Sequence, residues 1–227
     1  MTGGLIVSPF PVEDPSALAA QEQVYGELAE SIRPLIDACV RTRVEPEELR
    51  AVAAEVRALT ERLLATAQDT PLGLETSSDG RLRDHGNPAI GLRNPIAPPL
   101  HITYPERGRA ECFFSLGAPY EGPPMHVHGG IVATVLDQVL GLLPAHIGRP
   151  GMTAYLNCTY RRPTPLGDLS CVAWVEEELG FKTLVRGELR DDQGRVTVEA
   201  EGLFVVPKWA RQHLGTPVGD AGDFDPV

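Results

Sequence analysis

The chain has 227 residues, a formal net charge of −11 and hydrophobic residues at 42% of its positions. This length suits one sizeable domain with an extension, or two small domains, and the composition allows a real hydrophobic core. The negative charge disfavours binding to nucleic acid, and an anionic small ligand would need a local basic patch.

Features that indicate the cellular compartment favour the cytoplasm. No C-x-x-C pair occurs, and the wide spacing of the cysteines predicts reduced thiols at Cys39, Cys112, Cys158 and Cys171. No basic region or long apolar core precedes Pro11, which argues against a signal peptide. The most apolar stretch, residues 131–145, is interrupted by Asp137 and Gln138 and is shorter than the ~20 residues that span a bilayer. We therefore expect a cytoplasmic protein without a membrane span.

Residues 1–68 are predicted to form a helical N-terminal extension. Apolar residues recur at helical spacing in two stripes, which are Leu18, Tyr25, Leu28, Ile32 and Leu35, and then Leu49, Val52, Val56, Leu59 and Leu63. Pro46, followed by Glu47 and Glu48, favours a helix start. We expect a helical hairpin that packs on its neighbour, with a regulatory or partner-docking role as the alternative.

The rest of the chain divides into a linker, a domain and a tail. Residues 69–108 are rich in proline and glycine, which predicts a loop and linker. Residues 109–208 are predicted to form the main domain, and residues 209–227 a C-terminal tail. Within the domain, a strand-like run at 110–116 precedes a helix starting at His128, and four further runs follow at 152–160, 169–177, 183–190 and 196–206. This order predicts an α+β fold, with one helix covered by an antiparallel sheet.

The predicted helix carries an acid within a nearly all-apolar segment. An all-round apolar helix is expected to be buried on all sides, yet Asp137 lies in its middle. A buried carboxylate is costly unless it is hydrogen-bonded or paired, so Asp137 is either a catalytic group or a structural acid with a backbone or arginine partner. Gly129 and Gly130 begin the helix and allow a ligand to approach its first N–H groups, as an oxyanion hole would require.

The spacing of these groups predicts an active site shared between two chains. Gly130 and Asp137 are seven residues apart, which corresponds to about 10 Å along a helix axis. One small carbonyl group cannot easily contact both residues of the same chain. Two antiparallel helices related by a two-fold axis would instead bring each Asp137 close to the Gly130 of the partner.

Segment 128–137, with the pattern H-G-G-x6-D, resembles the signature of hotdog-fold thioesterases of the PaaI-like branch. Three further segments are similar to the sub-branch of thioesterase superfamily members four and five: E-G-P-P at 121–124, M-T-A-Y-L-N at 152–157 and R-R-P-T-P-L-G-D at 161–168. The resemblance covers about residues 109–207, under half of the chain, and does not account for the N-terminal helices.

The resemblance implies a hotdog fold, a homodimer or dimer of dimers, and hydrolysis of acyl-CoA thioesters in fatty acid metabolism. The matching positions imply Asp137 as base or nucleophile and Gly130 as backbone oxyanion donor. They also imply His128 as a support of that loop and Thr153 as a positioner of water or carboxylate. Many PaaI-like enzymes have asparagine six residues before the histidine, where this chain has Gly122. Carbonyl polarisation here must therefore rest more on backbone groups.

Two arginines, two histidines and one cysteine near the motif are further candidates for binding or chemistry. Arg161 and Arg162 follow a strand-like run, where they can grip the CoA phosphates or form salt bridges with nearby acids. His126 and His128 form an H-x-H pair without an evident third ligand, so we expect no metal, and the resemblance implies no cofactor. Cys158 has no neighbouring histidine that would activate it as a nucleophile.

Two other functions fit the same fold. One is a non-catalytic acyl-CoA-binding protein, which would have no need of Asp137 and Thr153. The other is a hotdog dehydratase, in which His128 would act as the base.

Overall fold

The computed structural model describes residues 15–72, 74–76, 82–208 and 211. In chain order the elements are α1 (Pro15–Arg41), α2 (Pro46–Leu64), β1 (Leu74–Thr76), β2 (Leu82–Asp84), β3 (His101–Glu106), β4 (Arg109–Leu116), the 3-10 helix η1 (Ala118–Tyr120), α3 (Gly129–His146), β5 (Met152–Tyr160), β6 (Gly167–Leu179), β7 (Lys182–Arg190) and β8 (Val196–Val205). The tail predicted over 209–227 lies outside the described residues, apart from Arg211.

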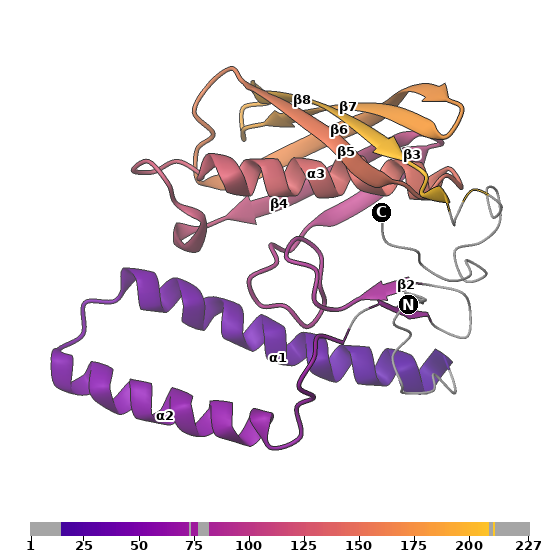
Figure 1. Cartoon of the computed structure of the whole chain (residues 1–227). Coiled ribbons are helices and arrows are strands. Elements are labelled where there is room, and N and C mark those ends of the chain that lie inside the picture. The colour runs from indigo at the N-terminus through magenta and orange to yellow at the C-terminus, as the bar shows by residue number, and fades with distance from the viewer. Residues whose placement is uncertain (1–14, 73, 77–81, 209–210, 212–227) are drawn as a thin grey trace.

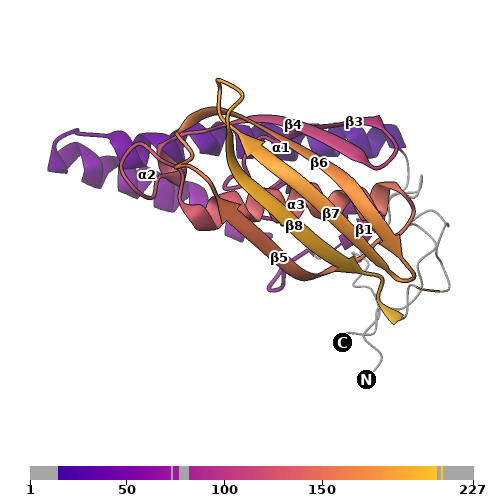
Figure 2. The ribbon, with the colours of Figure 1, turned by 90° about the horizontal axis from the view of Figure 1, so that it is seen from above.

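Six strands form one antiparallel sheet, in the order β3-β4-β6-β7-β8-β5. Helix α3 lies under this sheet and runs across it, as Figures 1 and 2 show from two directions. The arrangement confirms the predicted α+β hotdog fold, with a long central helix covered by an antiparallel sheet. The four runs predicted after the helix correspond to β5, β6, β7 and β8.

Helix α3 fits against the sheet because one side of it is apolar and closely packed. Its buried residues are Val132, Val135, Leu136, Val139, Leu140, Leu143 and Pro144. Gly187 on β7 allows a close approach, since a Cβ at this position would lie 2.7 Å from Cδ1 of Leu140. The prediction of a helix buried on all sides is wrong for the single chain, because Asp137 and its side of α3 are only half-buried.

The apolar composition of α3 follows from its place beneath the sheet. Its 18 residues have a mean hydropathy of 1.2, so by length and composition alone the helix could cross a membrane. A core helix needs the same composition, and the buried side chains of α3 belong to the hydrophobic core.

The segment predicted as a linker, residues 69–108, contains three strands, so the domain boundary set at Arg109 needs correction. Strand β3 pairs with β4 in the main sheet, and Ile102 and Tyr104 pack against the core. Strands β1 and β2 form a separate two-stranded sheet. Pro105 lies in β3 at the sheet edge, where a missing N–H is tolerated, so the prolines of this segment concealed a strand.

The predicted N-terminal helical extension is present as α1 and α2, which lie antiparallel beside the unit formed by the sheet and α3 (Figure 1). Helix α1 buries Leu18 and Ala29 and contacts η1. The guanidinium of Arg93 lies 3.5 Å from the ring centroid of Tyr25, which further ties α1 to the following loop. No residue of α2 is buried in the described chain.

Candidate active site

Asp137 and Thr153 are brought together by α3 and β5. The Thr153 hydroxyl donates a hydrogen bond to Oδ1 of Asp137 at 3.0 Å. Thr153 lies on the edge strand β5, next to a register shift between Thr153 and Tyr155. Such irregularities bend a strand locally and re-aim its side chains. Asp137 is half-buried and Thr153 is exposed, so the carboxylate is both oriented and reachable.

The thiol of Cys158 lies within the electrostatic reach of Asp137. Burial raises the pKa of the Cys158 thiol, and the negative charge of Asp137 raises this pKa further. The thiolate is the nucleophilic form of cysteine. Burial and the nearby negative charge therefore favour the neutral thiol of Cys158 and disfavour this cysteine as a nucleophile.

The N-terminus of α3 is capped by His128. The Gly130 N–H donates to Nδ1 of His128 at 3.0 Å, and the Ile131 N–H donates to the His128 carbonyl at 2.9 Å. The Gly130 amide, which the sequence suggests as oxyanion donor, is thus engaged by the cap. The Gly129 N–H has no acceptor within the described ranges. The N–H groups of Gly129 and Gly130 thus lie next to each other at the start of α3, and that of Gly129 is open to a ligand.

Tyr160 is a site residue that the sequence analysis missed. Its hydroxyl donates to the Gly129 carbonyl at 2.8 Å, which fastens the start of α3 to the end of β5. Burial raises the pKa of the Tyr160 hydroxyl, and neighbouring Cys158 raises it further, so the hydroxyl stays protonated as a donor. A single tyrosine at the end of a strand carries no distinguishing sequence pattern, so only the fold identifies it.

A cavity of about 420 Å³ adjoins the start of α3 and includes Gly129, Tyr160, Arg161 and Arg162 in its lining. Arg161 is paired with Glu199 at 2.8 Å, and this hydrogen bond raises the pKa of the Arg161 guanidinium. No ion pair of Arg162 occurs among the residues that the structure describes. Of the two arginines that the sequence suggests as phosphate ligands, Arg162 is therefore better placed for a new anionic partner.

The four cysteines within the described chain are free, and two of them are neighbours in the core. Cys112 and Cys171 are register partners on β4 and β6, and both are buried. Burial raises the pKa of the Cys112 thiol to about 12 and also raises that of Cys171. These two thiols are structural and lie apart from the Asp137 site.

The sequence and the fold are similar to those of known proteins. The thioesterase superfamily model matches residues 125–198, which include Asp137 and Thr153. Acyl-coenzyme A thioesterase THEM4 of Xenopus laevis is 33% identical over 102 residues, or 43% of this chain and 45% of that protein. Acyl-coenzyme A thioesterase THEM5 of Mus musculus is 26% identical over 137 residues, or 60% of this chain and 55% of that protein.

The chain spans about half the length of these curated relatives. A solved structure described as a thioesterase superfamily protein is similar over a larger part of the chain. It is 33% identical with a TM-score of 0.69, and the match covers 80% of this chain and 94% of that one.

Proposed function

The chain belongs to the thioesterase superfamily, and from this premise we propose that it hydrolyses acyl-CoA thioesters to a free acid and CoA. The observation that carries the proposal is the half-buried carboxylate of Asp137, which Thr153 orients at 3.0 Å. A carboxylate held in this way supplies a base or nucleophile, and the N–H groups at a helix N-terminus supply donors for an oxyanion. The names of the curated relatives support the acyl-CoA substrate.

In the proposed reaction, Asp137 takes a proton from water as the water oxygen attacks the thioester carbon. The resulting tetrahedral intermediate collapses, its carbon–sulfur bond breaks, and the CoA sulfur leaves with the proton held by Asp137. In the alternative route, Asp137 attacks the carbon itself, the carbon–sulfur bond breaks, and CoA leaves as a thiolate that takes a proton from solvent. Water then hydrolyses the resulting mixed anhydride, which releases the free acid and restores Asp137. Thr153 holds the carboxylate in position in either route, through the hydrogen bond to Oδ1.

The proposed oxyanion site is the start of α3. The open Gly129 N–H can donate directly to a substrate oxygen, whereas Gly130 must first exchange its bond to His128. The helix dipole adds a partial positive charge at the same point. In this proposal, His128 positions the Gly-Gly turn and Tyr160 holds the Gly129 carbonyl away from the oxyanion.

We further propose that the protein acts as a homodimer, or a dimer of dimers, with each active site shared between two chains. Gly130 and Asp137 lie on one continuous helix, which separates them by about 10 Å along its axis. A second copy packed against the half-buried side of α3 would bring Asp137 of one chain to the α3 N-terminus of the other. Arg162, which lines the cavity at the start of α3, would then be available to bind a phosphate of CoA.

Replacing Thr153 by valine is expected to lower kcat by about 10-fold or more, with a smaller change in KM. Valine has almost the same shape but lacks the hydroxyl that orients Asp137. The measurement is steady-state release of CoA, with Thr159→Val on the same exposed strand as the matched control. A change confined to KM would assign Thr153 to binding instead of catalysis.

Product analysis separates hydrolysis from the two alternatives. With a 3-hydroxyacyl-CoA as substrate, a thioesterase releases free CoA and the 3-hydroxy acid. A dehydratase would form an enoyl-CoA with its thioester intact, and a binding protein would leave the substrate unchanged. We expect free CoA and hydroxy acid in equal amounts, measured by chromatography and thiol titration.

A further inference from the structure

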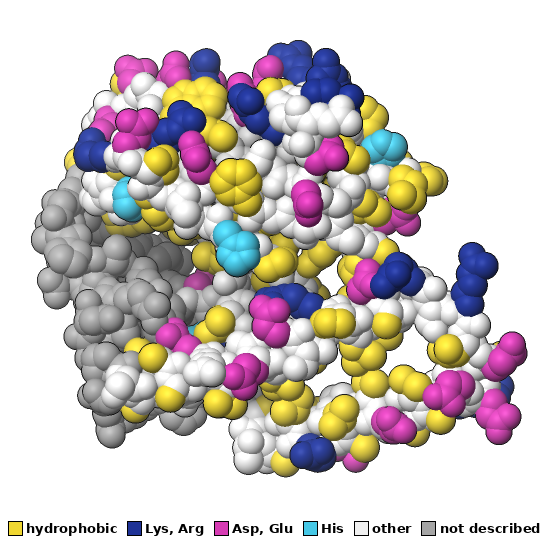
Figure 3. Space-filling view, turned by 180° about the vertical axis from the view of Figure 1, so that it is seen from behind, with side chains coloured by type: hydrophobic (Ala, Val, Ile, Leu, Met, Phe, Trp, Pro, Cys, Tyr) yellow, Lys and Arg dark blue, Asp and Glu magenta, His cyan; other side chains and the backbone are white. Residues whose placement is uncertain are grey.

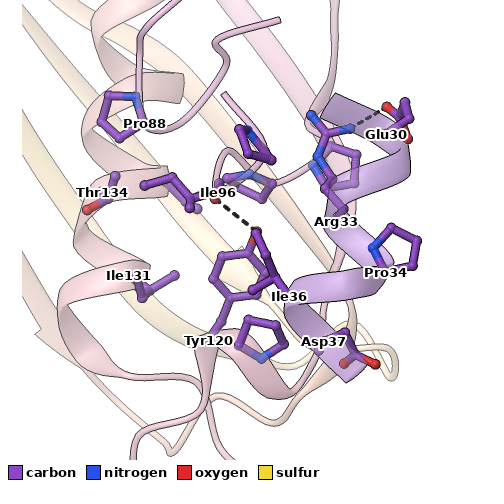
Figure 4. A pocket seen from close by; sticks show the side chains of 16 residues that line it. Glu30, Arg33, Pro34, Ile36, Asp37, Pro88, Ile96, Tyr120, Ile131 and Thr134 are labelled. Carbon is purple, nitrogen blue, oxygen red and sulfur yellow. Dashed lines mark hydrogen bonds and ion pairs between the residues drawn. The ribbon is translucent and has the colours of Figure 1, made fainter. Parts of the chain in front are cut away.

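A second, larger cavity lies between α1, the proline-rich loop and α3. It measures about 680 Å³, within the ~300–1,000 Å³ typical of ligand pockets. Figure 4 shows Ile36 of α1 and Ile96 of the loop across from Ile131 and Thr134 of α3. The lining from α1, the loop and the η1 region precedes residues 125–198, which the superfamily model matches, and only the lining from α3 lies within that range. We call this cavity the α1–α3 pocket.

The polar side chains that line this pocket already have hydrogen-bond or ion-pair partners within the protein. The Tyr120 hydroxyl donates to the Ile96 carbonyl at 3.0 Å, and Nε of Arg33 donates to the Ala97 carbonyl at 3.1 Å. Arg33 also forms an ion pair with Glu30. A polar ligand would have to break these bonds, because each group has found its partner within the protein.

The remaining lining favours an apolar ligand. Asp37 is held by an ion pair with Arg41, whose Nε donates to it at 2.7 Å. Prolines, which have no N–H to offer, contribute much of the rest of the lining: Pro34, Pro88, Pro95, Pro98, Pro99 and Pro119. In Figure 3, hydrophobic side chains gather between the two N-terminal helices and the sheet–α3 unit. The α1–α3 pocket therefore suits an uncharged hydrocarbon group.

A ridge on α3 connects the pocket to the candidate active site. Ile131 and Thr134 line the pocket, and Asp137 lies a further three residues along the same helix. Residues three apart are neighbours on a helix surface, so Thr134 lies midway between Ile131 and Asp137 around the axis. The Thr134 hydroxyl is turned onto the Gly130 carbonyl at 2.9 Å. The hydroxyl of Thr134 therefore already has a hydrogen-bond partner, and its methyl group is left to face an apolar chain that runs from the pocket to Asp137.

We propose that the α1–α3 pocket holds the hydrocarbon chain of a medium- or long-chain fatty acyl-CoA, and this inference rests on the proposed thioesterase function. The N-terminal extension is then a specificity element that selects the acyl chain by its length. Each methylene that enters the pocket favours binding by roughly four-fold, the factor that corresponds to the transfer of one methylene from water. An acetyl group is too short to extend along the ridge and gains nothing from the pocket.

The test fills the pocket from two separate walls. Ile36→Trp acts from α1 and Ile96→Trp from the loop, so a folding defect in one leaves the other available. Val40→Trp is the matched control, because Val40 is exposed on α1 and does not belong to the lining. We expect both pocket variants to lower kcat/KM for dodecanoyl-CoA by at least about 10-fold, while acetyl-CoA changes by less than about two-fold and Val40→Trp behaves as the wild type.

The outcomes distinguish this inference from the proposed function. Suppose that the wild type releases CoA from dodecanoyl-CoA. If the folded Ile36→Trp and Ile96→Trp variants do so equally well, the pocket does not hold the acyl chain. The same conclusion follows if both variants lose activity equally toward acyl-CoAs of every chain length. If the wild type releases no CoA from any acyl-CoA, the proposed function fails, and calorimetry with free dodecanoate decides about the pocket. If dodecanoate binds to the wild type but to neither variant, the result supports a site for an apolar chain. If dodecanoate binds equally to all three proteins, or does not bind to the wild type, the inference is overturned.

Discussion

Replacing Asp137 by asparagine is expected to lower the rate of CoA release by about 100- to 10,000-fold, the range associated with loss of a general base. Asparagine keeps the shape of the side chain and an oxygen that can accept the 3.0 Å hydrogen bond from Thr153. It cannot accept a proton from water or act as a nucleophile. The effect should therefore fall on kcat, measured with a saturating acyl-CoA.

The control for this experiment is Asp192→Asn in the exposed turn between β7 and β8, which makes the same substitution at the opposite end of β8 from Phe204, the register partner of Thr153. Both variants should melt at nearly the temperature of the wild type. If a well-folded Asp137→Asn protein releases CoA at the rate of the wild type, then Asp137 is a structural acid and the proposed mechanism is wrong.

Mixing two inactive variants is expected to restore activity, because the proposed site takes Asp137 from one chain and Gly130 from the other. One variant is Asp137→Asn, and the other is Gly130→Val. A Cβ at position 130 would lie 3.2 Å from Nδ1 of His128, so valine disturbs the cap and blocks approach to the α3 N-terminus. In a mixed dimer both lesions fall in one site, and the other site is intact. Activity should reach about half that of a wild-type dimer.

Subunit exchange must be verified, for example by affinity tags of two kinds on the two variants. If verified mixed dimers stay inactive while both variants remain folded, Asp137 and Gly130 serve the same site within one chain. In that case the axial separation of about 10 Å does not prevent joint action, and the substrate lies along α3.

The domain core could be predicted from the sequence because local pattern and tertiary structure agree there. Strand β4 alternates between buried and less buried residues, and α3 begins at the Gly-Gly pair after His128. Strand β3 was missed because Pro105 and the surrounding prolines suggest a loop, whereas an edge strand tolerates a missing N–H. Its place in the sheet depends on pairing with β4, which no local pattern reveals.

The candidate site was predictable only in part. The resemblance pointed to Asp137 and Thr153, and the fold brings them into contact. The engagement of the Gly130 amide by His128 depends on the geometry of one turn, and the Tyr160 contact joins segments 31 residues apart. The α1–α3 pocket joins four separate segments of the chain, so its existence could not be inferred from any one of them.

The central claim is that the protein cleaves acyl-CoA thioesters, and release of free CoA by the purified wild-type protein tests it most directly. A panel of acyl-CoAs from acetyl to palmitoyl would be incubated with the protein, and thiol and free acid would be measured together. We expect catalytic turnover, with thiol and acid formed one to one. Absence of CoA release across the whole panel, by folded protein that binds these substrates, would contradict the account and leave an acyl-CoA-binding protein.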